Sequence, residues 1–526
     1  MLENSDKYRE LIRTLNKIGK ALSIEKNIDK LLELILAGAM ELTHADGGTL
    51  YLINDKSELE FSIIANKTLK IKPSKASDLT WTPEPIPVYI HGEPNLKNVA
   101  AYCYHENKTV SIDDAYHAQG FDFTRMRKAD EKMNYRSKSF LTIPLRDHEN
   151  KRIGVLQLIN AIDDESHQIV SFTRQQILVA ESLASQAAIT LTKQELMDAQ
   201  KNLFKAFLEL IAKAIDEKSH YTSNHCKRVP VLTSMIATAM NNVSAGPLKD
   251  MHFTHDQFEE LMIASWLHDC GKIVTPVYVL DKAKKLHTLC DRMEVINARF
   301  EIIKRDLKIA YMEKLYNANS DAKSKLEREY QDKINFLNES QEFLNISNIG
   351  GEFLSDKEQA RIRALGTEYF YYEGNEKKPL LTEDDIMNLS IARGTLNDKE
   401  RMIIQNHVKL THSMLQSLPY PEYLKNVPEI AGSHHERVDG KGYPKGIGVE
   451  SLSIQARILA IADIFEALTA GDRPYKKAKT LKEVLKIMDD MKNTGHIDPD
   501  LYALFINEKI YLEYAKKYLD PEQIDT

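Results

Sequence analysis

The 526-residue sequence is poor in cysteine and has no long apolar run. Its longest apolar stretches, such as the one that begins at Leu31, are far shorter than the ~20 residues of a membrane-spanning helix, and the charged first ten residues are unlike a signal peptide. The four cysteines contain no CxxC pair, which indicates free thiols in a reducing compartment. We therefore expect a cytoplasmic protein with no membrane insertion.

Positive charge is not in excess either, because 70 lysine and arginine residues stand against 77 aspartate and glutamate residues, for a net charge of −7. The two signs are mixed along the chain, which argues against a nucleic-acid polymer as partner and leaves small anions possible. A chain of this length exceeds the ~100–200 residues of a typical domain, so we expect two or three domains.

The first 200 residues predict an α+β domain followed by a connecting helix. From Ile24 to Glu41 apolar residues recur at helical spacing. Residues 70–133 are expected to be mostly irregular. From Ser171 helical spacing returns without glycine or proline, which predicts a stiff helix able to pair as a coiled coil. Runs typical of antiparallel strands, bounded by turn-forming residues, are 48–54, 59–66, 108–112, 139–145 and 152–160.

From Leu203 to the C-terminus the pattern is helical throughout, which predicts an all-α region. Two long helical patterns, residues 290–315 and 322–344, meet at the polar break YNANSD. They predict a helical hairpin with charged outer faces.

The stretch WLHDCGK places His268 and Asp269 side by side near the end of an apolar helix. Adjacent side chains on a helix point about 100° apart, so such a pair suits two neighbouring metal ions better than one. Lys272 lies four residues after His268 on the same helix face, where an ammonium group makes sense if a phosphate lies between it and the metals. An isolated His-Asp pair is more often an exposed helix end, so this motif alone does not decide.

Other histidines and one aspartate strengthen the metal hypothesis. Asp463 lies in a helix that is apolar on nearly all sides, where a carboxylate without a partner is costly to bury. His225 and His407 lie on amphipathic helices, and each taken alone is more often a surface or hydrogen-bonded core histidine. His434 and His435 stand next to each other before a loop rich in glycine.

This combination of nitrogen and carboxylate ligands suits Fe, Mn, Zn, Ni or Co. If Asp269 bridges two such divalent ions, the remaining coordination positions fit a hydroxide and two phosphate oxygens, the arrangement used for attack on a phosphoester. Lys272 would then assist on a phosphate oxygen.

The motifs NHCKRV, LHDCGK, HVKLTH, HHERVDGKGYP and AIADIFEALTAGDRPYKKA occur in this order, and the series resembles the HD-GYP subgroup of HD-domain phosphohydrolases. The likeness covers residues 203–525 except 284–393. Members of that subgroup hydrolyse cyclic di-GMP to linear pGpG, in some cases on to GMP, with two or three metal ions, and some act on cyclic GMP-AMP. The resemblance therefore implies a metal-dependent cyclic-di-GMP phosphodiesterase.

Carried over by position, the resemblance also implies site residues. Lys272 would contact the phosphate and work with Asp269 in catalysis, while Gly442, Tyr443 and Pro444 would form the loop that gives the subgroup its name and would bind substrate. Members with three metals carry a Glu four residues before the first histidine; Tyr221 stands there, which favours two divalent transition metal ions. The implied metal ligands are His225, His268, Asp269, His407, His434, His435 and Asp463. The implied substrate-binding cations are Arg473 and Lys476, for which a solvated basic turn is the alternative.

The N-terminal stretches LTHADGGTLYLIND, YRSKSFLTIPL and GVLQLINA resemble a GAF domain over residues 24–196. That resemblance implies a sensor domain with a possible small-molecule ligand. Asp122, Asp130 and Arg136 are candidates for a nucleotide pocket, and the alternative is loop charges on a dimer scaffold.

We therefore expect a multidomain protein in which an α+β GAF domain is joined by a long helix to an all-α HD-GYP domain with a helical-hairpin insertion. The expected boundaries are 1–23 for an N-terminal helical segment, 24–170, 171–202 and 203–526, with the insertion at 284–393 as a lid, a dimerisation element, a partner dock or an inert decoration. The predicted function is cyclic-di-GMP hydrolysis under GAF control in a homodimer formed through the GAF domain and the connecting helix. The alternatives are an adaptor that binds a cyclic dinucleotide with little turnover, and a phosphohydrolase for cyclic GMP-AMP or another nucleotide.

Overall fold

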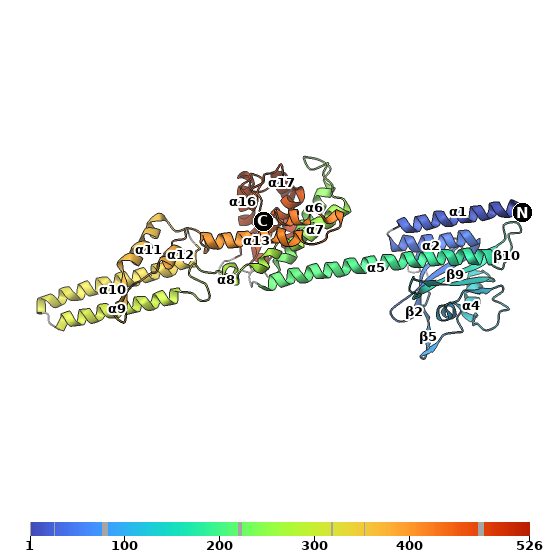
Figure 1. Ribbon diagram of the computed structural model, residues 1–526, viewed down its shortest axis with the longest axis horizontal. Helices are drawn as coiled ribbons and strands as arrows, with labels where there is room; N and C mark the ends of the chain where they lie inside the picture. Colours follow the sequence, from blue (N-terminus) through green and yellow to red (C-terminus); the bar gives the residue numbers. More distant parts are fainter. Residues whose placement is uncertain are drawn as a thin grey trace. The chain divides into compact units, whose positions relative to one another are not determined.

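The computed structural model describes residues 2–25, 27–75, 83–218, 224–316, 319–351, 353–471 and 478–525. The chain divides into two compact units, Met1–Phe204 and Lys205–Thr526 (Figure 1). None of the helices in the described residues is both long and apolar enough to cross a membrane.

The N-terminal unit is an antiparallel sheet with helices on both faces, as the sequence predicts. Its strands follow the order β3-β2-β1-β9-β8-β7. The strands are β1 (Ala45–Ile53), β2 (Glu58–Asn66), β3 (Ile71–Lys75), β7 (Val110–Ile112), β8 (Phe140–Arg146) and β9 (Arg152–Ile162), with β4 (Ile86–Pro87) on β2, β10 (Ile169–Val170) on β9 and a separate pair, β5 (Tyr89–Ile90) and β6 (Glu93–Pro94).

One face of this sheet is covered by α1 (Leu2–Ile24), α2 (Ile28–Thr43) and the first part of α5 (Arg174–Lys218), which share one apolar core with β1, β8 and β9. The prediction of one helix over residues 24–41 is wrong at its start, because α1 ends at Ile24 and α2 begins at Ile28. Asn27 interrupts it, because its side chain accepts a hydrogen bond from the Lys30 N–H and caps α2.

Residues 70–133 are more regular than expected. They contain β3 and the helices α3 (Val99–Glu106) and α4 (Thr124–Met133). Helix α4 is not predicted by hydrophobic periodicity. Its one buried residue is Asp130, which is polar, so the helix presents no continuous apolar stripe to the core. The long helix α5 continues without a break to Lys218, so the expected boundary at residue 203 falls within it.

The C-terminal unit is a helical bundle around one large apolar core. Its helices are α6 (His225–Asn242), α7 (His255–Leu267), η2 (Cys270–Val274), α8 (Val277–Leu280), α13 (Asp398–Gln416), η3 (Glu422–Leu424), α14 (Val427–Ala431), α15 (Ile454–Thr469), α16 (Leu481–Asn493), α17 (Pro499–Asn507), α18 (Ile510–Tyr518) and η4 (Pro521–Gln523).

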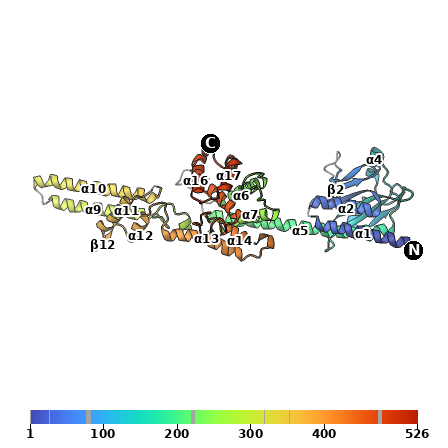
Figure 2. The same ribbon diagram turned by 90° about the horizontal axis from the view of Figure 1, so that it is seen from above.

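The segment between α8 and α13 contains the predicted helical hairpin, α9 (Met293–Tyr316) and α10 (Ser320–Ile349), which lie side by side in both views (Figure 2). It also has a core of its own, shared with α11 (Asp356–Glu368) and α12 (Glu383–Leu389). The all-α expectation is wrong in one detail, because β11 (Phe370–Glu373) and β12 (Glu376–Pro379) form a hairpin here. Gly374, at a φ of 61°, makes its tight turn.

Candidate metal centre

The seven predicted ligands come from five separate helical segments and meet at one buried place. His225 is the first residue of α6, and His268 and Asp269 lie where α7 ends and η2 begins. His407 lies in the middle of α13. His434 and His435 follow α14, and Asp463 lies in the middle of α15.

Asp269 lies between two groups of histidines. Its Oδ2 atom is 3.4 Å from His225 Nε2 and 3.3 Å from His268 Nε2. Its Oδ1 atom is 3.3 Å from His407 Nε2 and 3.9 Å from His434 Nε2. Each carboxylate oxygen therefore faces a different pair of imidazoles, which is the geometry of a carboxylate that bridges two ions.

Two half-sites result. In the first half-site Asp463 Oδ1 joins His225 and His268, at 3.2 Å and 3.7 Å from their Nε2 atoms. In the second half-site His435 joins His407 and His434, and the three offer nitrogen atoms within 4.8 Å of one another. We call these groups the first and the second half-site, with Asp269 shared by both.

The donor atoms at the centre are buried without hydrogen-bond partners. This holds for Asp269 Oδ1 and for Nε2 of His225, His268, His407 and His434. Buried polar atoms are nearly always satisfied, and leaving one without a partner costs about 1–3 kcal/mol. Five such atoms pointing at one place fit divalent metal ions that take nitrogen and oxygen ligands.

The Nδ1 atoms of these histidines make hydrogen bonds that fix the orientation of the imidazole rings. His268 Nδ1 donates to Ser265 O at 2.8 Å, and His434 Nδ1 donates to Ala431 O at 2.6 Å. His407 Nδ1 makes the same contact to the carbonyl three residues before it, at 2.5 Å. With the proton held on Nδ1, the Nε2 lone pair is directed into the centre, as metal-binding histidines require.

His225 differs from the other three because it is the first residue of its helix. Its Nδ1 instead contacts the carboxylate of Glu466, whose other oxygen accepts from Arg228 Nε at 2.6 Å. Glu466 is 1% exposed. The sequence analysis missed this residue, although a carboxylate three residues after Asp463 on the same apolar helix was a usable signal.

The carboxylates of the first half-site determine the pKa values of its two histidines. Burial lowers the pKa of His268, but Asp269 and Asp463 outweigh this effect and raise the pKa to about 9. Burial also lowers the pKa of His225, and Glu466 with the same two aspartates raises it well above its usual range. Without metal, this half-site therefore attracts positive charge.

The second half-site is electrostatically different. Burial lowers the pKa of His435 to about 4, and burial together with the neighbouring imidazoles of His435 and His268 holds the pKa of His434 well below its usual range. Both rings are therefore neutral near pH 7 and ready to act as ligands.

Lys272 lies on η2 with its Nζ atom 2.6 Å from Asp269 Oδ2. Its side chain is 21% exposed, the most open of the charged groups around Asp269. Gly271 precedes it, and a Cβ atom there would lie 2.0 Å from His407 O, so glycine is needed for this turn to pack against α13. The turn thereby joins Asp269 and Lys272 to the helix of the second half-site.

The loop of Gly442, Tyr443 and Pro444 folds back over the histidine pair. The Tyr443 ring lies 4.9 Å from the His435 ring, and the Tyr443 N–H donates to His435 O at 3.2 Å. A Cβ atom on Gly442 would lie 2.5 Å from Glu436 Cα, so the close approach requires glycine. Buried Glu436, a second residue that sequence reasoning missed, accepts from the N–H groups of Lys445 and Ile447 at 2.6 Å and 3.1 Å and holds the loop.

Three residues named from the sequence, Tyr221, Arg473 and Lys476, lie outside the described residues. In the N-terminal unit, the buried Asp130 carboxylate accepts hydrogen bonds from Tyr116 and Ser137. The Arg136 guanidinium lies over the Tyr116 ring, 4.7 Å from its centre. Asp122 caps the start of α4 through the Thr124 N–H at 2.9 Å. The structure gives each of these three side chains a local partner.

Two family profiles match the chain. Residues 27–191 match the GAF domain, and residues 381–501 match the HD domain, a range that holds His407, His434, His435 and Asp463. The chain therefore combines an N-terminal GAF domain with a C-terminal HD domain.

Part of the chain is also similar to named phosphodiesterases. The 3'3'-cGAMP-specific phosphodiesterase 3 of Vibrio cholerae is 39% identical over 111 residues, which are 21% of this chain and 23% of the relative. The cyclic di-GMP phosphodiesterase PA4108 of Pseudomonas aeruginosa is 35% identical over 123 residues, 23% of this chain and 28% of the relative. The chain thus spans about a quarter of the length of these relatives.

Among solved structures, the GAF domain of an Acinetobacter phosphoenolpyruvate-protein phosphotransferase aligns at 12% identity with 36% of this chain and 98% of its own length. The TM-score is 0.27, which is too low to add to the GAF profile match.

Proposed function

We propose that this chain is a metal-dependent phosphodiesterase that hydrolyses cyclic di-GMP to linear pGpG in the cytoplasm, with GMP as the alternative end product. The observation that carries the proposal is the pair of half-sites with unsatisfied, inward-facing donor atoms on either side of Asp269. Its setting would be an HD-GYP domain at 203–526, with an insertion at 284–393, joined through a helix at 171–202 to a GAF domain at 24–170. The substrate class is supported by the named phosphodiesterases to which part of the chain is similar.

Two divalent transition metal ions (Fe, Mn, Ni, Co or Zn) held by the seven ligands would supply Lewis acidity for attack of water on a phosphodiester. Asp269 fixes the spacing of the half-sites because both of its oxygens are committed. Lys272 is placed to bind a phosphate oxygen once Asp269 is taken up by metal, since it is the cation at the rim of the centre. The Tyr443 ring lies beside the His435 ring, and the loop of Gly442, Tyr443 and Pro444 is proposed to contact substrate there. Arg473 and Lys476 are proposed to bind a second phosphate or a guanine edge.

The test is turnover by purified protein reconstituted with Mn²⁺ or Fe²⁺, with products separated by chromatography. Linear pGpG should form, and Asp269→Ala should lose both metals and activity together because the bridge holds the two half-sites. A protein with full metal occupancy and no product would instead be a cyclic-dinucleotide-responsive adaptor. Retention of two metals by Asp269→Ala would contradict the ligand assignment.

Cyclic GMP-AMP is the second candidate substrate, because the relative of 39% identity is named as specific for it. Parallel assays with cyclic di-GMP, 3'3'-cyclic GMP-AMP and a guanosine polyphosphate decide between them through their relative kcat/KM values. A preference for cyclic GMP-AMP would change the substrate and leave the metal chemistry in place.

We further propose that the chain acts as a homodimer through the GAF domain and α5, with a small-molecule ligand of the GAF domain as the input. Ile189, Leu196, Leu203 and Leu210 are 48%, 59%, 59% and 60% exposed and recur every seven residues on α5. This spacing places them at one of the two seam positions of a coiled-coil heptad. Light scattering of Leu196→Lys should show a monomer where the native chain is a dimer, and an unchanged mass would exclude this seam.

A further inference from the structure

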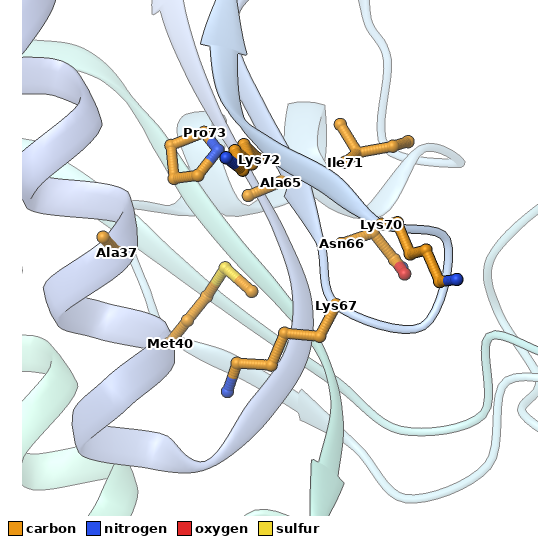
Figure 3. A pocket seen from close by; sticks show the side chains of 9 residues that line it. All are labelled: Ala37, Met40, Ala65, Asn66, Lys67, Lys70, Ile71, Lys72 and Pro73. Carbon is orange, nitrogen blue, oxygen red and sulfur yellow. The ribbon is translucent and has the colours of Figure 1, made fainter.

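A cavity of about 430 Å³ lies in the N-terminal unit between α2 and the β2–β3 hairpin. Figure 3 shows Ala37 and Met40 on the helix side and the hairpin residues on the other side. Small-molecule sites have volumes of roughly 300–1,000 Å³. The cavity is therefore large enough for a small organic ligand.

The charges around this cavity have one sign. Lys67, Lys70 and Lys72 line it, and none of its lining residues is acidic. Lys75 of the same hairpin pairs with Asp29 at 2.7 Å, whereas no ion pair within the described part of the chain involves the three lining lysines. Lys67 extends toward Met40 on α2, across the cavity (Figure 3). Three like charges on one short hairpin repel each other, and an anion between hairpin and helix would relieve that repulsion.

The turn that carries the lysines is fixed by buried polar groups. Asp46, 6% exposed, accepts from the Thr68 N–H at 3.2 Å and from the Thr68 hydroxyl at 2.8 Å. Asn66, also 6% exposed, accepts from the Leu69 N–H at 2.8 Å. The backbone of the turn is thereby held in place before any ligand arrives, which lowers the entropic cost of binding.

Apolar surface completes the site. Met40, Ala65 and Ile71 line the cavity together with Ala37 and Pro73. Met40 and Ala65 are only 4% and 3% exposed, so the apolar surface open to a ligand lies mainly at Ala37, Ile71 and Pro73. An anion with an apolar body would cover this surface and gain roughly 25 cal/mol for each Å² buried, which phosphate or sulfate alone would not.

We propose that this cavity binds a small organic anion, with a phosphate or carboxylate head at Lys67 and an apolar body against Met40 and Ile71. This anion would be the small-molecule ligand of the GAF domain that we propose above. Binding of the anion does not depend on that proposed function, and only the effect of binding on the enzyme rests on it. That consequence follows from packing: α2 shares its apolar core with Leu183 and other residues of α5, so a ligand against α2 acts on α5.

Calorimetric titration of the full-length protein tests binding without using turnover. The probes are hexyl phosphate, hexanoate, hexanol and inorganic phosphate. Saturable binding of hexyl phosphate or hexanoate, tighter than that of hexanol and inorganic phosphate, is expected. The stronger of the two anions identifies the head group, and absence of saturable binding by both would overturn the proposal.

Variants locate the bound probe. Lys67→Glu should weaken binding of the preferred anion at least about tenfold, a change of ~1.4 kcal/mol. Lys56→Glu makes the same charge change in the turn between β1 and β2, away from the cavity, and should bind as the native protein does. Ala37→Phe, at an exposed helix position, should fill the cavity and abolish binding of the alkyl probe. Equal affinities in the two glutamate variants, or undiminished binding by Ala37→Phe, would overturn the assignment, whatever the enzyme assay shows.

Discussion

Replacing Glu466 with glutamine should separate the two half-sites of the metal centre. The Glu466 carboxylate contacts His225 Nδ1 with one oxygen and Arg228 Nε with the other. Glutamine keeps the shape of the side chain, but it has one acceptor oxygen for two donors and carries no charge. His268, His407 and His434 use backbone carbonyls for the same purpose, so the substitution changes the first half-site and leaves the second half-site intact.

The size of the effect follows from this contact. Loss of a partner that orients a metal-binding histidine costs about 10–100-fold in metal affinity, or ~1.4–2.7 kcal/mol. Removing the charge opposite Arg228, whose side chain is 16% exposed, also lowers the free energy of unfolding. Breaking a buried ion pair costs roughly 3–5 kcal/mol, and the hydrogen bond that glutamine retains should keep the loss below that range. We therefore expect a folded protein with one weakened metal position.

The assay is a titration of metal-free protein with Mn²⁺ in competition with a chelator of known affinity. The native protein should bind two ions, and Glu466→Gln should bind one with unchanged affinity and the other about 10–100-fold more weakly. Asp498→Asn is the matched control, because Asp498 is a buried carboxylate that pairs with Arg457 at 2.6 Å and contacts none of the metal ligands. Two ions of native affinity in Glu466→Gln, or equal weakening of both, would refute the assignment of Glu466 to the first half-site.

The candidate metal ligands could be named from the sequence because ligand chemistry restricts residue type. A carboxylate such as Asp463 in an otherwise apolar helix needs a partner, whereas the His268–Asp269 pair does not decide alone and points to a metal only together with the other histidines. Glu466 carries the same signal on the same helix, but its partner could not be assigned from the sequence. Its role depends on His225 being the first residue of α6 and on the packing of α6 against α15, and both are tertiary facts.

The elements of the fold likewise divide into those that the sequence predicts and those that it does not. The strands β1, β2, β7, β8 and β9 and the hairpin of α9 and α10 have strong periodicity, and they appear where it predicts them, whereas β3 lies in a stretch expected to be irregular. Helix α4 and the β11–β12 hairpin were missed because they bury little apolar surface, so their sequences carry no stripe and no clear alternation. Periodicity reports burial, and elements held by caps, turns and edge contacts remain outside its reach.

Three further substitutions test the centre and the insertion. Lys272→Ala should keep its metals and lose on the order of 100-fold in kcat, because it removes a phosphate contact and no ligand; loss of metal would contradict this role. Gly442→Ala would place a Cβ atom 2.4 Å from Arg437 N, so it should displace the loop and lower turnover while metal analysis stays unchanged. Lys285 is 1% exposed, its Nζ donates to Leu389 O at 3.0 Å, and burial lowers its pKa to about 8. In the unfolded chain this pKa returns to about 10.4. Between about pH 8 and 10.4 the unfolded state therefore binds more protons than the folded state, and the free energy of unfolding rises with pH. The amount by which Lys285 destabilises the folded protein falls accordingly. Lys285→Met should therefore raise the thermal midpoint at pH 7 and raise it less at pH 9.5. A difference between the two proteins that stays constant or grows with pH would show that Lys285 is not buried as an uncompensated charge.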